Sequence, residues 1–284
     1  MYFCTMKKII CESGATKADW RVVEDGKQTA RVLTGGTNVS AMRADAVLEV
    51  IREAGAALPE GPYDGVHFYT AGVVTDEILA WLLPALQQAF ACPDVEVQND
   101  LTAAARAACG HAPGIAAILG TGSNSCQYDG EKIVRRVCAG GFILGDDGSA
   151  SVIGKLFIAD YIKNLVPEDL AREFDEAFPG MDYPTIVTNV YHSSGSPSAW
   201  LGAFCPFLLS HYSHPYVKQL VDGSLRAFIE RSLLQYETDR YPVGIIGGFG
   251  NALKEILTPL LEERGIRIRA FISSPIDELI RYHS

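Results

Sequence analysis

Two stretches of the chain share one order of apolar, small and charged positions. Each begins with an apolar run, residues 8–11 in the first and 115–119 in the second, and passes directly into a turn of small residues. An Asp-Gly pair, a run of charged and β-branched residues and a Gly-Gly pair then follow in both. This order predicts three strands, joined by a small-residue turn and an Asp-Gly hairpin. The matched pairs are Asp25-Gly26 with Gly35-Gly36, and Asp129-Gly130 with Gly140-Gly141.

The rest of the pattern predicts an α/β protein in which helices alternate with further strands. The first half reads as strands near 7–13, 19–24 and 28–34, a helix near 40–55, a strand at 65–70, a helix at 75–90, a strand at 95–98 and a helix at 101–109. The second half reads as strands near 115–120, 124–129 and 132–138, a helix at 149–164, a mainly helical block, a strand at 243–246, a helix at 251–264, a strand at 266–272 and a short final helix.

This order places a domain boundary near residues 108–114, where the second set of hairpins begins. We expect an N-terminal domain at 1–110 and a C-terminal domain at 111–284, the latter with a helical insertion at about 165–236. A cleft between two duplicated halves is the expected ligand site.

Composition narrows the class of protein. The 284 residues are 48% hydrophobic and 20% charged, which suits a packed core, and the net charge is −10. An acidic chain without a basic stripe disfavours nucleic acid and anionic membranes as partners. Seven widely spaced cysteines without a C-x-x-C motif favour reduced thiols in the cytoplasm. The N-terminus lacks the pattern of a secretory signal, and no apolar run reaches the roughly 20 residues of a membrane span.

The two small-residue turns are candidates for binding phosphate. Backbone N–H groups in such turns can point at an anion, and glycine lets the chain come close without a Cβ clash. One turn of this kind is usually only a tight connection, whereas a matched pair favours a polyphosphate ligand. Lys17 is equally compatible with phosphate contact and with a solvated side chain. The candidate residues are Gly14, Ala15, Thr16 and Lys17 in the first turn and Gly120, Thr121 and Gly122 in the second.

Carboxylates follow predicted strands at two places. Asp100 comes at the end of a strand and the start of a helix, where it is either a helix N-cap or a general base for a substrate hydroxyl. Asp146 and Asp147 precede a helix, where they form either an acidic first turn, a site for substrate hydroxyls or a water-mediated Mg²⁺ site. Gly247, Gly248 and Gly250 lie between a buried strand and a helix, which suits close approach of a nucleotide.

These loops, in this order, resemble the actin/hexokinase/Hsp70-like (ASKHA) superfamily. More narrowly, the chain resembles the BadF/BadG/BcrA/BcrD ATPase-type family, which contains N-acetylglucosamine kinases. The resemblance covers nearly the whole chain and is strongest over residues 120–125, over 145–149 and at Asn99-Asp100. It implies two RNase-H-like domains that close on ATP, Mg²⁺ and a sugar.

The resemblance also implies roles for individual residues. Asp100 would take the proton from the sugar hydroxyl, and Asn38, Asn124 and Asp146 would help bind the sugar. The two turns would hold the phosphates, with Gly247, Gly248 and Gly250 against adenosine. The first loop of the family normally begins with Asp, which positions Mg²⁺ and its water, whereas this chain has Glu12. The additional methylene moves the carboxylate by over an ångström unless the backbone adjusts.

The sequence therefore predicts ATP-dependent phosphorylation of an amino sugar, with N-acetylglucosamine as the first candidate. Glu12 keeps a non-catalytic sugar or nucleotide sensor open as an alternative. A reductase-activating ATPase ranks lower, because the cysteine motif that holds its iron–sulfur cluster has no match here. The sequence leaves a homodimer open and does not give the sugar or the hydroxyl phosphorylated.

Overall fold

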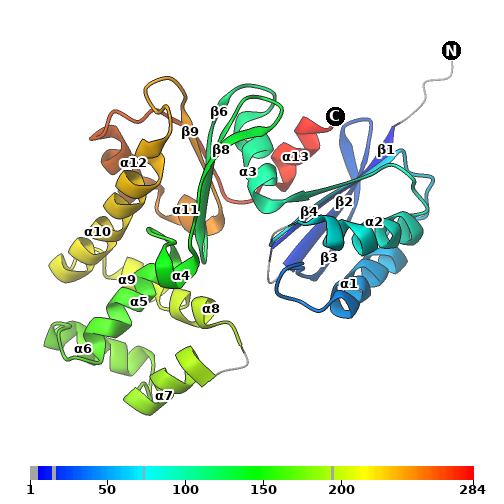
Figure 1. The fold of residues 1–284 in the computed structure, drawn as a ribbon. Coiled ribbons are helices and arrows are strands. Elements are labelled where there is room, and N and C mark those ends of the chain that lie inside the picture. The colour runs from blue at the N-terminus through cyan, green and yellow to red at the C-terminus, as the bar shows by residue number, and fades with distance from the viewer. Residues whose placement is uncertain (1–5, 15–16, 73, 193–194) are drawn as a thin grey trace. The chain divides into compact units, whose positions relative to one another are not determined.

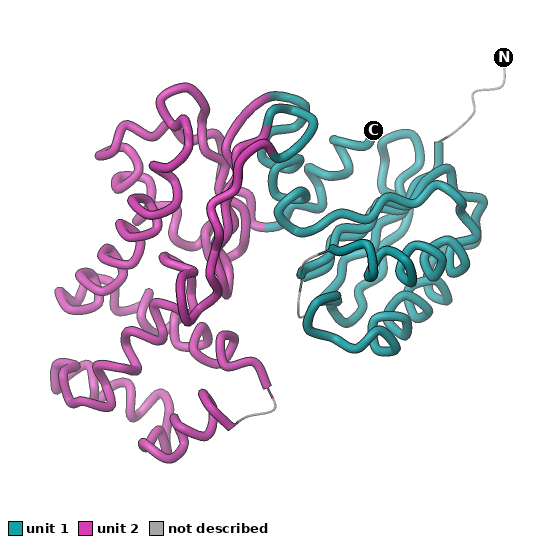
Figure 2. Tube along the Cα trace, viewed as in Figure 1, with its two compact units in different colours: residues 1–112, 129–133, 274–284 teal, residues 113–128, 134–273 magenta. Residues whose placement is uncertain are grey.

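The computed structural model describes residues 6–14, 17–72, 74–192 and 195–284, which form two compact units (Figure 2). Unit 1 comprises Met1–Ala112, Asp129–Ile133 and Ser274–Ser284, and unit 2 comprises Pro113–Tyr128 and Val134–Ser273. The candidate residues Ala15 and Thr16 lie outside the described residues.

Both units contain a five-stranded sheet of the same topology (Figure 1). The orders are β3-β2-β1-β4-β5 and β10-β9-β6-β7-β8, so each sheet joins a three-stranded antiparallel meander to two further parallel strands. The predicted duplicated α/β fold is thereby confirmed. The strands are β1 (Lys7–Ser13), β2 (Lys17–Glu24), β3 (Lys27–Gly35), β4 (Gly65–Thr70), β5 (Val95–Asn99), β6 (Gly114–Leu119), β7 (Ser123–Tyr128), β8 (Ile133–Val137), β9 (Val243–Ile246) and β10 (Ile268–Ile272).

The predicted Asp-Gly hairpin between β2 and β3 is present. Asp25 and Gly26 both have positive φ, 48° and 75°, as the two central residues of a type I′ turn require. Asp and Gly tolerate this region, so the local sequence is sufficient to fix the turn.

In unit 1, helices cover both faces of the sheet. The helices are α1 (Ala44–Ala57), α2 (Asp76–Phe90), α3 (Asp100–Cys109) and α13 (Ile276–Tyr282). Alternate residues of β1 point to opposite faces: Ile9 and Cys11 pack with α1 and α2, while Ile10 packs with α3 and α13. The carboxyl ends of β1, β4 and β5 lie at one edge of the sheet, where the loops that follow them can carry a site.

The C-terminal helix α13 lies in a different domain from the one that the sequence predicts. The prediction assigned all of 111–284 to the second domain, whereas α13 packs within unit 1. Its Ile276, Leu279 and Ile280 are buried in one cluster with Ile10 and other residues of unit 1. In addition, Nε2 of His283 lies 2.7 Å from the hydroxyl of Tyr69 on β4, within hydrogen-bond distance. Burial of this apolar face holds the last helix on unit 1.

Unit 2 carries the helical block, which packs with the sheet around one large apolar cluster. The sequence pattern misses the short helix α4 and joins two helices, α11 and α12, that Leu253 separates. The helices are α4 (Gly141–Leu144), α5 (Ala150–Tyr161), α6 (Glu168–Ala177), α7 (Tyr183–Val187), the π-helical η1 (Thr188–His192), α8 (Pro197–Gly202), α9 (Cys205–Ser210), α10 (Pro215–Arg231), the 3₁₀ turn η2 (Leu233–Gln235), α11 (Gly248–Ala252) and α12 (Lys254–Glu262).

Candidate active site

The first group of site residues lies at the carboxyl edge of the unit 1 sheet. Glu12, near the end of β1, pairs in register with Asp19 on β2 and Tyr69 on β4. The pKa of Glu12 is raised to about 7, chiefly by burial; Lys17 lowers it, and the nearby charges of Asp100 and Asp19 contribute to the rise. Glu12 and Asp100 therefore lie close enough for each charge to act on the other.

Asp19 is not equivalent to these two carboxyls. Arg21 donates to it at 2.6 and 2.8 Å, and Arg31 donates at 3.1 and 2.9 Å. Burial raises the pKa of Asp19, but these hydrogen bonds outweigh burial and hold it below its ordinary value. Because two guanidinium groups already neutralise Asp19, a cation at this edge would face Glu12 and Asp100. A buried carboxyl with a second carboxyl close to it fits a divalent cation, which favours oxygen ligands.

The helix-cap interpretation of Asp100 is wrong, because the neighbouring residue has that role. Oδ1 of Asn99 accepts hydrogen bonds from the backbone N of Thr102 at 2.8 Å and from its Oγ1 at 3.0 Å. Asp100 is the first residue of α3 and is half-buried. Its carboxylate is thus not required to cap the helix, and it lies where β5 ends, as a general base should.

Asn38 reaches the same edge through the segment between β3 and α1. This segment bridges the residue after β4, since Asn38 pairs with Ala71 and the N of Val39 donates to the Ala71 carbonyl at 3.1 Å. The carboxyl ends of β1, β4 and β5 therefore bring Glu12, Asn38 and Asp100 to one edge of unit 1. Gly14 and Lys17 lie at the adjoining turn, where the N of Gly14 donates to the Lys17 carbonyl at 3.0 Å.

The second turn lies in unit 2, between β6 and β7. The carbonyls of Gly120 and Thr121 accept hydrogen bonds from the N of Ala150 and of Ser151, both at 3.0 Å, which fix the turn against the start of α5. Gly122 faces Asp146, since a Cβ on Gly122 would be 2.9 Å from Oδ2 of Asp146. A side chain at position 122 would therefore displace the Asp146 carboxylate.

The three glycines after β9 have different surroundings. Gly247 has φ +118°, and a Cβ there would be 2.4 Å from the carbonyl oxygen of Leu119. A Cβ on Gly250 would be 2.7 Å from Cγ2 of Ile245 and 3.0 Å from Cβ of Leu119. Gly248 has no described atom within 4 Å of such a Cβ. Packing against the end of β6 thus explains Gly247 and Gly250, whereas Gly248 offers open space to a ligand beside the 120–122 turn.

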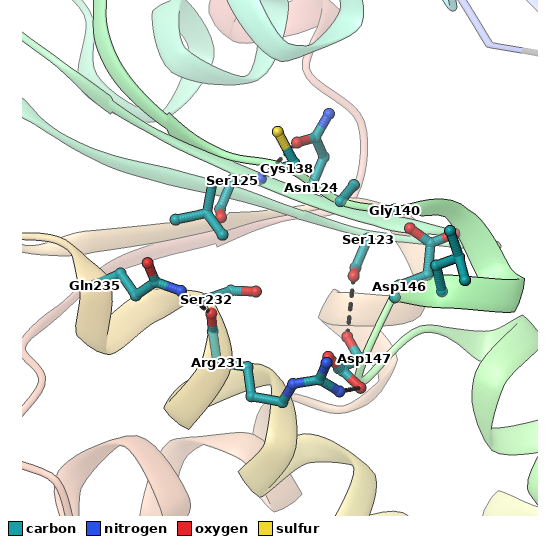
Figure 3. Close-up of a pocket in the computed structure, with 14 residues that line it drawn as sticks. Ser123, Asn124, Ser125, Cys138, Gly140, Asp146, Asp147, Arg231, Ser232 and Gln235 are labelled. Carbon is teal, nitrogen blue, oxygen red and sulfur yellow. Dashed lines mark hydrogen bonds and ion pairs between the residues drawn. The ribbon is translucent and has the colours of Figure 1, made fainter.

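A polar cavity of about 330 Å³ lies in unit 2 beside Asn124 and Asp146 (Figure 3). Burial raises the pKa of Asp146, the Ser123 backbone N–H lowers it, the charge of Asp147 raises it and Lys155 lowers it. Figure 3 shows Arg231, at the end of α10, reaching Asp147, with Nη1 3.0 Å from Oδ1. The cavity combines carboxylate acceptors with guanidinium and amide donors, as the hydroxyls of a sugar require.

Sequence reasoning missed several residues of this cavity. Arg231 and Gln235 lie in the helical block, which the pattern treats as an insertion without a site. No local motif connects Arg231 to Asp147, because the contact depends on how α10 packs. The missed lining residues with polar side chains are Ser123, Ser125, Cys138, Arg231, Ser232 and Gln235.

Another cluster offers metal-ligand atoms within 4.8 Å of one another, namely His67, Glu96 and His283 in unit 1. Arg106 donates to both carboxylate oxygens of Glu96, at 2.9 and 2.7 Å. The two imidazole rings are stacked, with centroids 3.6 Å apart. A cation would have to displace the Arg106 charge from Glu96, so the cluster fits a structural network that anchors α13.

No protein-family model and no curated protein matches the chain. Among solved structures, a Porphyromonas gingivalis protein described as a "putative N-acetylglucosamine kinase" is 36% identical, covers 97% of this chain and 98% of its own, and has a TM-score of 0.87. A Chromobacterium violaceum protein with the same description is 21% identical over 98% and 99%, with a TM-score of 0.75. A ROK family glucokinase from Streptomyces griseus, solved with glucose and AMPPNP, is 18% identical over 98% and 97%, with a TM-score of 0.59.

The duplicated sheets have the topology of the ASKHA fold of sugar kinases, and the last two structures support the fold alone. At 36% identity over nearly the full length of both chains, the protein belongs to the same family as the Porphyromonas gingivalis protein, that of the N-acetylglucosamine kinase-like sugar kinases. The narrower assignment to the BadF/BadG/BcrA/BcrD ATPase-type family stays a prediction. Within the described residues, every helix is too short or too polar to cross a membrane.

Proposed function

We propose that the protein transfers the γ-phosphoryl group of ATP to a hydroxyl of an amino sugar, with N-acetylglucosamine as the first candidate. The observation that carries the proposal is the position of Asp100, at the carboxyl end of β5 with the capping role taken by Asn99. The similarity to the Porphyromonas gingivalis protein supports the choice of sugar.

The proposal divides the work among the residues of the two units. In unit 1, Asp100 accepts the proton of the attacking hydroxyl, while Asn38 holds the sugar. In unit 2, Asn124 and Asp146 bind sugar hydroxyls, backbone N–H groups of Thr121 and Gly122 hold phosphate oxygens, and the open surface at Gly248 receives adenosine. Lys17 provides the corresponding phosphate contact in unit 1, since the Gly14 N–H donates to the Lys17 carbonyl.

Glu12 is the residue that would hold Mg²⁺, through a water molecule. When bound, the ion would neutralise charge on the transferring phosphoryl group. The presence of Glu12 in place of Asp is also compatible with a non-catalytic sensor. A carboxylate displaced from the position that Mg²⁺ requires would leave ligand binding intact while removing phosphoryl transfer.

A coupled assay of ADP release across a small panel of sugars tests the proposal. The panel would include N-acetylglucosamine, glucosamine, N-acetylmannosamine and glucose, with Asp100→Asn and a chelator as controls. We expect turnover with an amino sugar that depends on Mg²⁺, and phosphorus NMR of the product would identify the hydroxyl. If a sugar of the panel binds but no sugar of the panel is phosphorylated, the protein is instead a sensor.

A further inference from the structure

The buried hydroxyl groups of Ser13, Thr37 and Thr70 form a hydrogen-bonded chain next to Asn38. Oγ1 of Thr37 donates to Oγ of Ser13 at 2.8 Å and lies 2.9 Å from Oγ1 of Thr70. The one hydroxyl proton of Thr70 faces three acceptors, namely Oγ1 of Thr37 and the carbonyl oxygens of Thr37 and Ala71, the latter two at 3.2 Å. The chain ends where Oγ of Ser13 donates to the Gly14 carbonyl at 3.3 Å. All three side chains are at most 1% exposed, so none of them contacts a ligand directly.

The hydroxyl chain connects three pieces of backbone at the carboxyl edge of unit 1. Oγ of Ser13 also accepts from the backbone N of Thr37 at 2.7 Å, and Oγ1 of Thr70 lies 3.2 Å from the Thr37 carbonyl oxygen. The ends of β1 and β4 are thereby tied to the residue just before Asn38. Buried hydrogen bonds of this kind hold one geometry, since a lost partner leaves a desolvated polar group.

The side chain of Asn38 has one fixed orientation. Its Oδ1 accepts hydrogen bonds from the backbone N of Ser40 and of Ala41, both at 3.2 Å. The amide oxygen is thus occupied by its own turn, and Nδ2 is left as the group that can donate to a ligand. The ligand atom opposite Asn38 must therefore be an acceptor oxygen.

The absence of a side chain at Gly72 leaves space for this orientation of Asn38. It has φ +94°, and a Cβ there would lie 2.6 Å from Oδ1 of Asn38 and 2.8 Å from Oγ of Ser40. A side chain at position 72 would push Asn38 out of its turn. Gly72, which follows β4, and the hydroxyl chain of Ser13, Thr37 and Thr70 thus constrain Asn38 independently of each other.

We propose that Ser13, Thr37, Thr70 and Gly72 are positioning residues for sugar recognition, which hold Asn38 so that Nδ2 donates to an acceptor oxygen of the sugar. The inference rests on the proposed function for the identity of the ligand. It adds to that function a set of residues that determine sugar affinity without touching the sugar.

The test measures the Kd of N-acetylglucosamine by calorimetry, independently of turnover, for the wild type and four variants. Thr70→Val keeps the shape of the side chain and removes the hydroxyl, whereas Thr70→Ser restores the hydroxyl. Asn38→Asp keeps the acceptor oxygen for the turn and removes the Nδ2 donor. Thr34→Val is the matched control, because it removes a buried threonine hydroxyl whose partner is Nε1 of Trp20 in the core.

We expect Thr70→Val and Asn38→Asp to weaken sugar binding about tenfold or more, with the Kd of ATP within about twofold of wild type. Thr70→Ser should recover most of the affinity, and Thr34→Val should lower the free energy of unfolding without changing the sugar Kd. If Thr70→Val fails to fold, Gly72→Ala provides the same comparison from the other side of Asn38.

An unchanged sugar Kd in Thr70→Val or Gly72→Ala would overturn the inference, as would an equal loss of ATP affinity. Failure of the proposed function has a different signature. A wild type that binds the sugar but transfers no phosphoryl group would refute the kinase, while the Kd series would still decide the role of the hydroxyl chain.

Discussion

Asn99 caps helix α3 through a 2.8 Å hydrogen bond to the backbone nitrogen of Thr102. The cap and the proposed base are thus two adjacent residues with separate functions. Removing the carboxylate of Asp100 should therefore affect chemistry more than stability, and removing Asn99 should have the opposite effect.

Asp100→Asn is expected to reduce phosphoryl transfer about 10²–10⁴-fold, because the amide cannot accept the proton of the sugar hydroxyl. Sugar and ATP affinities should stay within about tenfold, and the free energy of unfolding should change little. Steady-state kinetics and denaturant unfolding measure these quantities. Asn99→Ala is the control, with an expected loss of about 1 kcal/mol in stability. A near wild-type rate in Asp100→Asn would remove Asp100 from the mechanism.

The raised pKa of Glu12 predicts how stability without metal depends on pH. Burial raises this pKa from 4.5 to about 7, so the neutral form is favoured in the folded state. The stabilisation that this provides is complete below the ordinary pKa and is lost as pH rises through about 7. Glu12→Gln should therefore be more stable than wild type at pH 8, with the difference shrinking towards pH 5. Urea unfolding in the presence of a chelator checks this, and a difference independent of pH would contradict it.

The dependence of the rate on Mg²⁺ should follow the ionisation of Glu12. With a pKa of about 7, roughly one tenth of Glu12 is ionised at pH 6 and roughly nine tenths at pH 8. The Mg²⁺ concentration for half-maximal rate should therefore fall as pH rises from 6 to 8. ADP release measured at several Mg²⁺ concentrations and pH values tests this, and the dependence should disappear in Glu12→Gln.

Glu12→Asp should keep or raise activity, because the family resemblance places Asp at this position. The shorter side chain restores the carboxylate position that such a loop normally offers to Mg²⁺. The measurement is kcat at saturating ATP, sugar and Mg²⁺. A large loss of kcat in a folded Glu12→Asp protein would show that the longer side chain is specifically required.

Gly247 and Gly248 are adjacent, and we expect alanine to reduce the stability at position 247 only. Gly247→Ala should destabilise the fold by about 1–3 kcal/mol, since its Cβ would be 2.4 Å from the Leu119 carbonyl at φ +118°. Gly248→Ala should stay within about 0.5 kcal/mol of wild type, because a Cβ there has open space.

If adenosine lies against this surface, Gly248→Ala should also raise the KM for ATP several-fold without a matching change in the KM for the sugar. Thermal unfolding and ATP titrations give both values. An unchanged KM for ATP would place adenosine elsewhere.

The sequence by itself determined the elements of this protein and their duplication. Apolar runs give the strands, and Asp25-Gly26 gives the type I′ turn. These features depend on contacts between residues close in the chain, so their physical causes are visible in a short window of sequence. Glu12, Asn38 and Asp100 were located from the motifs they resemble, and their roles stay predictions.

Only the tertiary structure decided which distant residues meet. The apolar face of α13 packs within unit 1, Arg231 at the end of α10 reaches Asp147, and the Thr70 hydroxyl donates to the Thr37 carbonyl at the edge of the sheet. Each contact depends on strand order and register or on how helices pack, which a local pattern does not contain. The choice of Asn99 over Asp100 as the cap was equally undecided, because both residue types cap helices and only the backbone geometry at the end of β5 distinguishes them.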